Sequence, residues 1–64
     1  MKVNGKERAM QAPVTLEAFL EQEGYRKDRI AVELNGSIIP KANYADTILS
    51  STDVLEVVSF LGGG

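Results

Sequence analysis

The sequence predicts an α+β domain, in which one amphipathic helix packs on one face of a mixed sheet of four to five strands. Three observations support this prediction. Two Asn-Gly pairs stand between strand-like segments, and Asn-Gly is the strongest short-range hairpin signal. One stretch, between Thr15 and Gly24, has helical periodicity. The last strand-like run, residues 54–60, is apolar enough for a central place in a sheet.

The first hairpin is expected to join a strand at about residues 1–4 to a second strand at about residues 7–11. Asn4-Gly5 would form the turn between them. The second strand is weakly patterned, because only Ala9 and Met10 could reach a core. Pro13 should end it, since proline cannot donate to a strand ladder.

The helix has clear signals at both ends. Thr15 is the expected N-cap, Val14 and Phe19 have the spacing of a hydrophobic staple, and Glu17 suits the positive end of the helix dipole. Gly24 should stop the helix in a left-handed conformation. The apolar stripe that should face the core consists of Leu16, Phe19 and Leu20.

A second hairpin follows the helix. Residues 30–34 alternate as a strand, with Ile30, Val32 and Leu34 on one face, and Asn35-Gly36 turns the chain into residues 37–39. Pro40 makes that second strand short or places it on an edge of the sheet.

The connection to the last strand contains little regular structure. We expect a loop with one helical turn at residues 41–46, with Tyr44 as an anchoring aromatic, then a brief strand at residues 47–49 and a turn at residues 50–53.

The last strand should have one buried face and one solvent-exposed face. Glu56 marks the solvent-exposed face, because burying an unpaired carboxylate is costly. Leu55 and Val57 should then point into the core. Val58 and Phe60 lie on the same face as Glu56 and should be exposed beside Leu61. Apolar residues clustered in this way indicate a surface that docks on another protein.

The chain ends in Gly62-Gly63-Gly64. We expect residues 1–60 to form the domain and residues 61–64 to form a flexible tail, which could reach roughly 13 Å when extended. Glycine has no Cβ and can enter a slot that is too narrow for side chains. This arrangement would deliver the Gly64 carboxylate to the active site of another protein.

Composition excludes several function classes. The 64 residues include no Cys and no His, so disulfides, most metal sites and the usual nucleophile–base pairs are excluded. A net charge of −2 argues against nucleic acid as a partner. No stretch has the length and apolar content of a membrane span or a signal peptide. We therefore expect a cytoplasmic protein that is not an enzyme by itself and that binds no metal or cofactor.

Four stretches carry a family resemblance: Val3-Asn4-Gly5, Ile30–Gly36, Ile38–Lys41 and Asp53–Gly64. In this order, over essentially the whole chain, they resemble the ThiS family of sulfur-carrier proteins of thiamine biosynthesis, which has a ubiquitin-like β-grasp fold. In that fold the first and last strands lie side by side and parallel. Thr52 departs from the pattern, because a glycine turn is expected before Asp53, and this puts the local turn geometry in question.

The resemblance implies a mechanism. A ThiF-like adenylating enzyme would use ATP to activate the Gly64 carboxylate as an acyl-adenylate. A sulfur donor protein would then displace AMP and leave a C-terminal thiocarboxylate, which would donate sulfur to a ThiG-like thiazole synthase. Gly62 and Gly63 would form the tail, and Val58, Phe60 and Leu61 would bind partners and position Gly64 for reaction.

Three alternatives remain open. The MoaD-like carriers of molybdopterin synthesis resemble the same fold and also end in Gly-Gly. A ubiquitin-like protein modifier would share the activation step but would join Gly64 to lysines of target proteins. A plain interaction domain would keep its activity when Gly63-Gly64 is deleted, whereas both carrier functions would be lost.

Overall fold

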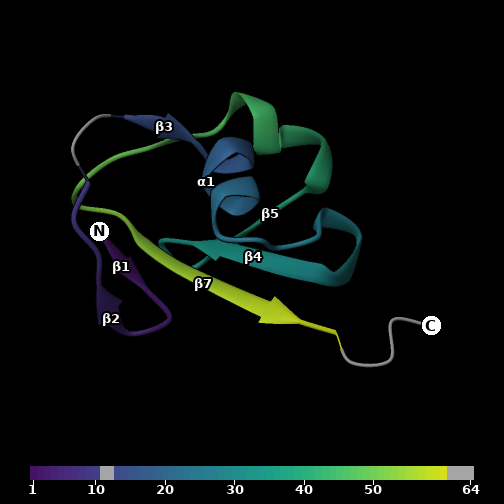
Figure 1. Cartoon of the computed structure of the whole chain (residues 1–64), viewed down its shortest axis with the longest axis horizontal. Helices are drawn as coiled ribbons and strands as arrows, with labels where there is room; N and C mark the ends of the chain where they lie inside the picture. The colour runs from purple at the N-terminus through teal and green to yellow at the C-terminus, as the bar shows by residue number, and fades with distance from the viewer. Residues whose placement is uncertain (11–12, 61–64) are drawn as a thin grey trace.

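The computed structural model describes residues 1–10 and 13–60, and five of its strands form one mixed sheet in the order β2-β1-β7-β4-β5 (Figure 1). The central strand β7 is parallel to β1 and antiparallel to β4. This arrangement confirms the predicted mixed sheet with its first and last strands side by side. The strands are β1 (Lys2–Val3), β2 (Lys6–Glu7), β4 (Ile30–Leu34), β5 (Ser37–Ile39) and β7 (Val54–Ser59).

Both Asn-Gly pairs form the predicted two-residue turns. The φ angles are 51° and 84° at Asn4 and Gly5, and 52° and 86° at Asn35 and Gly36. Positive φ at both central positions is the type I′ geometry that matches the twist of a hairpin. The second turn sets the register of β4 on β5, with Leu34 opposite Ser37. As predicted, β5 is short and lies at the edge of the sheet.

The second strand is shorter than the predicted span of residues 7–11. β2 contains only Lys6 and Glu7, because β1 offers two residues for pairing. One further backbone hydrogen bond, from the Arg8 N–H to the Met1 carbonyl at 2.7 Å, ends the ladder. Ala9 is exposed and Met10 is only partly buried against the core. The weak apolar pattern after Glu7 therefore belongs to a loop.

Helix α1 (Leu16–Gln22) begins and ends where the sequence predicts. The Thr15 hydroxyl accepts a hydrogen bond from the Ala18 N–H at 3.1 Å, which satisfies one of the free donors of the first turn. Gly24 follows the helix with a φ of 82°. The three residues of the apolar stripe, Leu16, Phe19 and Leu20, are all buried.

The core lies between α1 and one face of the sheet (Figure 1). The sheet contributes alternate residues of β4 and β7, which gives both strands one buried face. Met1 also belongs to the core, which the sequence did not indicate. The buried residues are Met1, Val3, Leu16, Phe19, Leu20, Ile30, Val32, Tyr44, Leu49, Leu55 and Val57.

A second, two-stranded sheet joins β3 (Val14–Thr15) to β6 (Ile48–Leu49). The sequence predicts a brief strand at residues 47–49 but not its partner. The Leu16 N–H also donates to the Thr47 carbonyl at 2.7 Å, so this small sheet fixes the start of α1 against the late part of the chain. The described residues also contain two 3₁₀ helices, at Lys27–Arg29 and at Lys41–Asp46. Tyr44 in the second of them is buried, as predicted.

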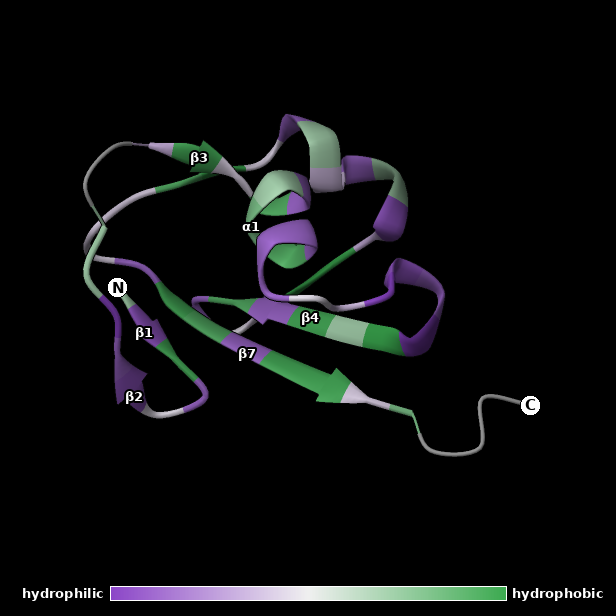
Figure 2. Ribbon diagram, in the orientation of Figure 1, coloured by the Kyte–Doolittle hydropathy of each residue, from purple (hydrophilic) through white to green (hydrophobic). Residues whose placement is uncertain are grey.

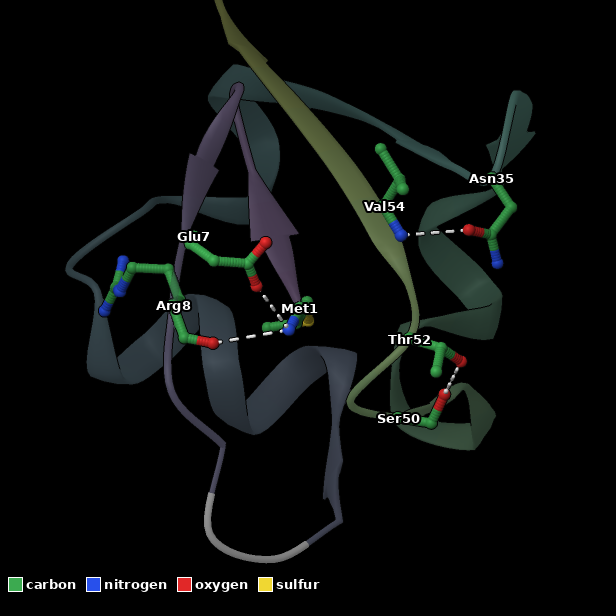
Figure 3. A network of polar contacts seen from close by, with 7 residues as sticks. All are labelled: Met1, Glu7, Arg8, Asn35, Ser50, Thr52 and Val54. Atoms are coloured by element: carbon green, nitrogen blue, oxygen red, sulfur yellow. Dashed lines mark hydrogen bonds and ion pairs between the residues drawn. The ribbon is translucent and has the colours of Figure 1, made fainter.

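The turn before β7 does not need a glycine at position 52. Thr52 is not among the residues with positive φ. The turn is closed by the Asp53 N–H, which donates to the Ser50 carbonyl at 3.1 Å, and by the Ser50 N–H, which donates to the Asp53 carboxylate at 2.8 Å. The hydroxyls of Ser50 and Thr52 lie 3.4 Å apart (Figure 3). Threonine therefore fits where the family pattern led us to expect glycine.

Among the helices of the described residues, none has both the length and the apolar character that a bilayer crossing requires.

Candidate functional site

The last strand leads directly into the segment that the sequence singles out. β7 ends at Ser59, and the Phe60 N–H donates to the Arg29 carbonyl at 2.8 Å. The backbone is therefore anchored to the sheet as far as Phe60. The predicted tail, residues 61–64, lies outside the described residues, so the roles of Leu61, Gly62, Gly63 and Gly64 stay predictions.

The two faces of β7 differ as predicted. Leu55 and Val57 are buried, whereas Val58 is 59% exposed and Phe60 is 53% exposed. Glu56 lies on the exposed face between them and Val54. Exposed apolar side chains next to the tail agree with a docking surface. The binding role of Val58 and Phe60 remains a prediction.

Two further apolar residues, beyond those that the sequence predicts for the docking surface, extend this exposed face. Val54 is 42% exposed and begins β7, and Ile38 of β5 is 65% exposed. Ile38 lies opposite Glu33 of β4, which in turn lies opposite Glu56. The exposure of Ile38 could have been predicted from the sequence, because a two-residue turn at Asn35-Gly36 places Ile38 opposite Glu33, on the solvent-exposed face.

The strongest ion pairs lie elsewhere and support the fold. The Arg8 guanidinium forms two hydrogen bonds of 2.8 Å to the Glu23 carboxylate, and these bonds lower the pKa of Glu23. The same guanidinium lies 5.7 Å from the centre of the Phe19 ring, within the range of a cation–π contact. A hydrogen bond from Lys27 to Glu17 raises the pKa of Lys27. These contacts fasten the segment after β2 to the C-cap of α1, and the 3₁₀ helix Lys27–Arg29 to the first turn of α1.

A shallow depression of about 410 Å³ lies beside the Arg8–Glu23 pair, with Met1 and Phe19 on its walls. The charged groups there are already paired: Arg8 with Glu23, and the Met1 ammonium with the Glu7 carboxylate at 3.3 Å and the Arg8 carbonyl (Figure 3). Among the described residues, no three acidic side chains converge in a way that could hold a metal ion. The exposed face of the sheet and the segment after it remain the candidate site.

Comparison with known proteins decides the family. The model of the ThiS family matches residues 1–64, the whole chain. The chain belongs to the ThiS family. Among solved structures, a thiamine biosynthesis protein (ThiS) from Geobacter metallireducens superposes with a TM-score of 0.82 at 26% identity, covering 98% of this chain and 96% of that one. The similarity of the two structures confirms that this chain has the ubiquitin-like β-grasp fold.

The similar curated proteins include longer chains. A thiazole synthase from Paramagnetospirillum magneticum is 44% identical over 62 residues, and one from Magnetococcus marinus is 36% identical over the same length. The match covers 97% of this ThiS-family chain but only 19% of each thiazole synthase. An uncharacterized protein, ycf40, from Pyropia yezoensis is 33% identical over all of this chain and 90% of its own length.

Proposed function

We propose that this chain is the sulfur carrier for thiazole formation in thiamine biosynthesis, and that Gly64 carries the sulfur as a thiocarboxylate. The observation that carries the proposal is the match of the ThiS family model to all 64 residues, Gly63 and Gly64 included. The similar ThiS structure favours thiamine over molybdopterin as the pathway. The chain acts as a co-substrate of partner enzymes and is not itself an enzyme.

The chemistry needs an activated carboxyl group. The Gly64 carboxylate attacks the α-phosphate of ATP on an adenylating enzyme, and pyrophosphate leaves. The terminal sulfur of a persulfide on the donor protein then attacks the acyl carbon, and AMP leaves. A thiol reduces the resulting acyl disulfide and releases the thiocarboxylate. ATP is bound by the partner, and the carrier supplies reach, an unhindered backbone and a docking surface.

Thiazole synthase is the proposed acceptor of the sulfur. A ThiS-like stretch of 62 residues occurs within the thiazole synthases of two organisms. Such a stretch supports a partnership between this domain and thiazole synthase, because it places the two activities in one chain there. An adenylating enzyme and a sulfur donor complete the set of partners, and this proposal places the chain in the cytoplasm.

Adenylation of altered C-termini tests the proposal. The protein is incubated with ATP and the adenylating enzyme of the same organism, and pyrophosphate release is measured. We expect release with the wild type and none when Gly63-Gly64 is deleted or when one alanine is added after Gly64, because the reacting carboxylate is then missing or displaced.

The matched control is the unfolding transition of the extended protein, which should equal that of the wild type. An extended protein that still supports pyrophosphate release would show that the reaction does not need a carboxylate at Gly64.

A further inference from the structure

The sheet face that points away from α1 carries most of the exposed apolar side chains. Of the five large hydrophobic residues that are exposed among the described residues, four lie on this face and Ile48 lies on β6. Figure 2 shows β7 as a hydrophobic strand interrupted by a hydrophilic band. We call this surface the open face; its strands β4, β5 and β7 contribute Ala31, Glu33, Ile38, Val54, Glu56 and Val58, Phe60 follows β7, and Lys2 of β1 lies at its edge opposite Val54.

Two glutamates occupy the middle of the open face. Glu33 of β4 lies directly opposite Glu56 of β7, and residues in such positions have Cβ atoms about 5 Å apart. Like charges directly opposite one another destabilise a sheet. Apolar side chains lie around the pair: Ile38 beside Glu33, with Val54 and Val58 on either side of Glu56. The pair therefore costs stability in the free protein.

Neither glutamate is neutralised within the part of the chain that the structure describes. The ion pairs found there involve Glu7, Glu17, Glu23 and Asp28. Lys2 lies opposite Val54 on the next strand, yet it forms no ion pair with Glu56 within residues 1–10 and 13–60. The open face thus presents two adjacent carboxylates among apolar side chains, with Lys2 at the β1 edge and no ion pair to either glutamate among the described residues.

The two adjacent carboxylates favour one kind of binding partner for the open face over another. A second copy of the chain, stacked with its own open face on this one, would bring four carboxylates together, and like-charge contact is an effective barrier to association. A partner with one basic side chain would instead relieve the repulsion. Arginine suits the position because its guanidinium is weakly hydrated and binds carboxylates through two parallel hydrogen bonds.

We propose that the adenylating enzyme docks on the open face by inserting an arginine or lysine between Glu33 and Glu56. Apolar side chains of the enzyme pack around it on Ile38, Val54 and Val58. This inference rests on the proposed function, because it names the chemistry of the surface that receives the carrier. Phe60, at the end of the face, then leads the chain into the active site of the enzyme.

The test compares carboxylates with amides of the same shape. The dissociation constant for the adenylating enzyme is measured by titration calorimetry for the wild type, for the double variant Glu33→Gln/Glu56→Gln and for the control Glu21→Gln on the exposed side of α1. Hydrogen bonds to charged groups contribute about 1.5–3 kcal/mol, so the double variant should bind about tenfold more weakly or worse. The control should bind like the wild type.

Salt dependence and stability give independent readouts. Wild-type binding should weaken as salt rises, and the double variant should lose most of that dependence. The double variant should also unfold at an equal or higher temperature than the wild type, because the repulsion is gone. Equal affinity and equal salt dependence of the wild type and the double variant would overturn the inference.

Two further outcomes separate the inference from the proposed function. If the enzyme adenylates the double variant as well as the wild type at carrier concentrations below saturation, the inference fails and the carrier function stands. If the enzyme does not adenylate the wild type at all, the proposed function fails, and the inference fails with it. Self-association of the wild type that Phe60→Ala abolishes would assign the open face to a second copy.

Discussion

Asn4 and Asn35 stabilise β7 from its two sides. The Asn4 N–H donates to the Leu55 carbonyl at 2.9 Å, and the Asn4 side-chain oxygen accepts from the Val57 N–H at 2.7 Å. Asn35 makes the same pair of contacts with Val54, through its N–H and its side-chain oxygen (Figure 3). In both turns the side-chain oxygen accepts from a backbone N–H of β7. Asparagine therefore serves both the turn and the ladder.

Asp53 links the Asn35 turn to the start of β7. The Asn35 side-chain N–H donates to the Asp53 carboxylate at 3.0 Å, and the Ser50 N–H donates to its other oxygen. The hydrogen bond from Asn35, followed by those from Ser50, lowers the pKa of Asp53 below its usual value. Because the folded state holds this proton less tightly than the unfolded state, the contribution of Asp53 to stability is present above the unfolded pKa, about 3.9. It is lost as the pH falls through the lower pKa of the folded state.

The variant Asp53→Asn tests this assignment at the residue scale. At neutral pH it should be less stable than the wild type, because an amide nitrogen replaces the oxygen that accepts from Ser50. Below about pH 4 the difference between the two proteins should shrink. Urea unfolding at a series of pH values measures both. A difference that is the same at every pH would mean that the charge of Asp53 does not contribute.

At the scale of elements, α1 and β7 show how one sheet has a packed face and an open face. Phe19 of α1 is 6% exposed and belongs to the core, whereas Phe60 after β7 is 53% exposed. The two aromatic residues have equal size and opposite surroundings. They therefore form a matched pair for separating stability from binding.

Phe19→Ala should lower the free energy of unfolding by about 3–5 kcal/mol, the usual cost of removing a large buried side chain. Phe60→Ala should change it by no more than about 0.5 kcal/mol, as exposed substitutions do, and should weaken binding to the adenylating enzyme. Denaturant unfolding and calorimetric titration provide the two measurements. A large loss of stability with Phe60→Ala would show that Phe60 is part of the core and not of a docking surface.

The elements that the sequence predicts correctly are those with local signals. The Thr15 cap and the Gly24 stop bound α1, and the alternation of residues 30–34 and 54–60 assigns β4 and β7 together with their buried faces. The pairing of β3 with β6 could not be predicted, since Val14 and Thr15 are extended next to residues more than 30 positions away in the chain. The burial of Met1 also depends on distant partners.

The parts of the candidate site that depend on local patterns could also be predicted from the sequence. The exposure of Val58 and Phe60 follows from the alternation of β7, and Ile38 follows from the register of the Asn35-Gly36 turn. That Glu33 lies opposite Glu56 could not be predicted, because it depends on the register in which β7 pairs with β4. A shift of this register by two residues would keep both strands amphipathic and would separate the two carboxylates.

At the scale of the whole molecule, the fold places the core and most of the exposed apolar side chains on opposite faces of the sheet. The core and α1 lie on one side of the sheet, and the open face lies on the other (Figures 1 and 2). β7 is the central strand and pairs with β1 on one side and β4 on the other, so the strand that ends next to Phe60 is held from both sides. In the proposed function, this strand would hold the base of the segment that carries Gly64.

The most direct test for a thiocarboxylate at Gly64 is the intact mass of the protein purified from its native host. In a second arm, the mass is measured after the purified protein is incubated with ATP, the adenylating enzyme and a sulfur donor. We expect a population that is heavier by the difference between one sulfur atom and one oxygen atom, and that is absent when Gly64 is deleted. An unchanged mass in both arms would contradict a thiocarboxylate at Gly64 and would favour a domain that only binds partners.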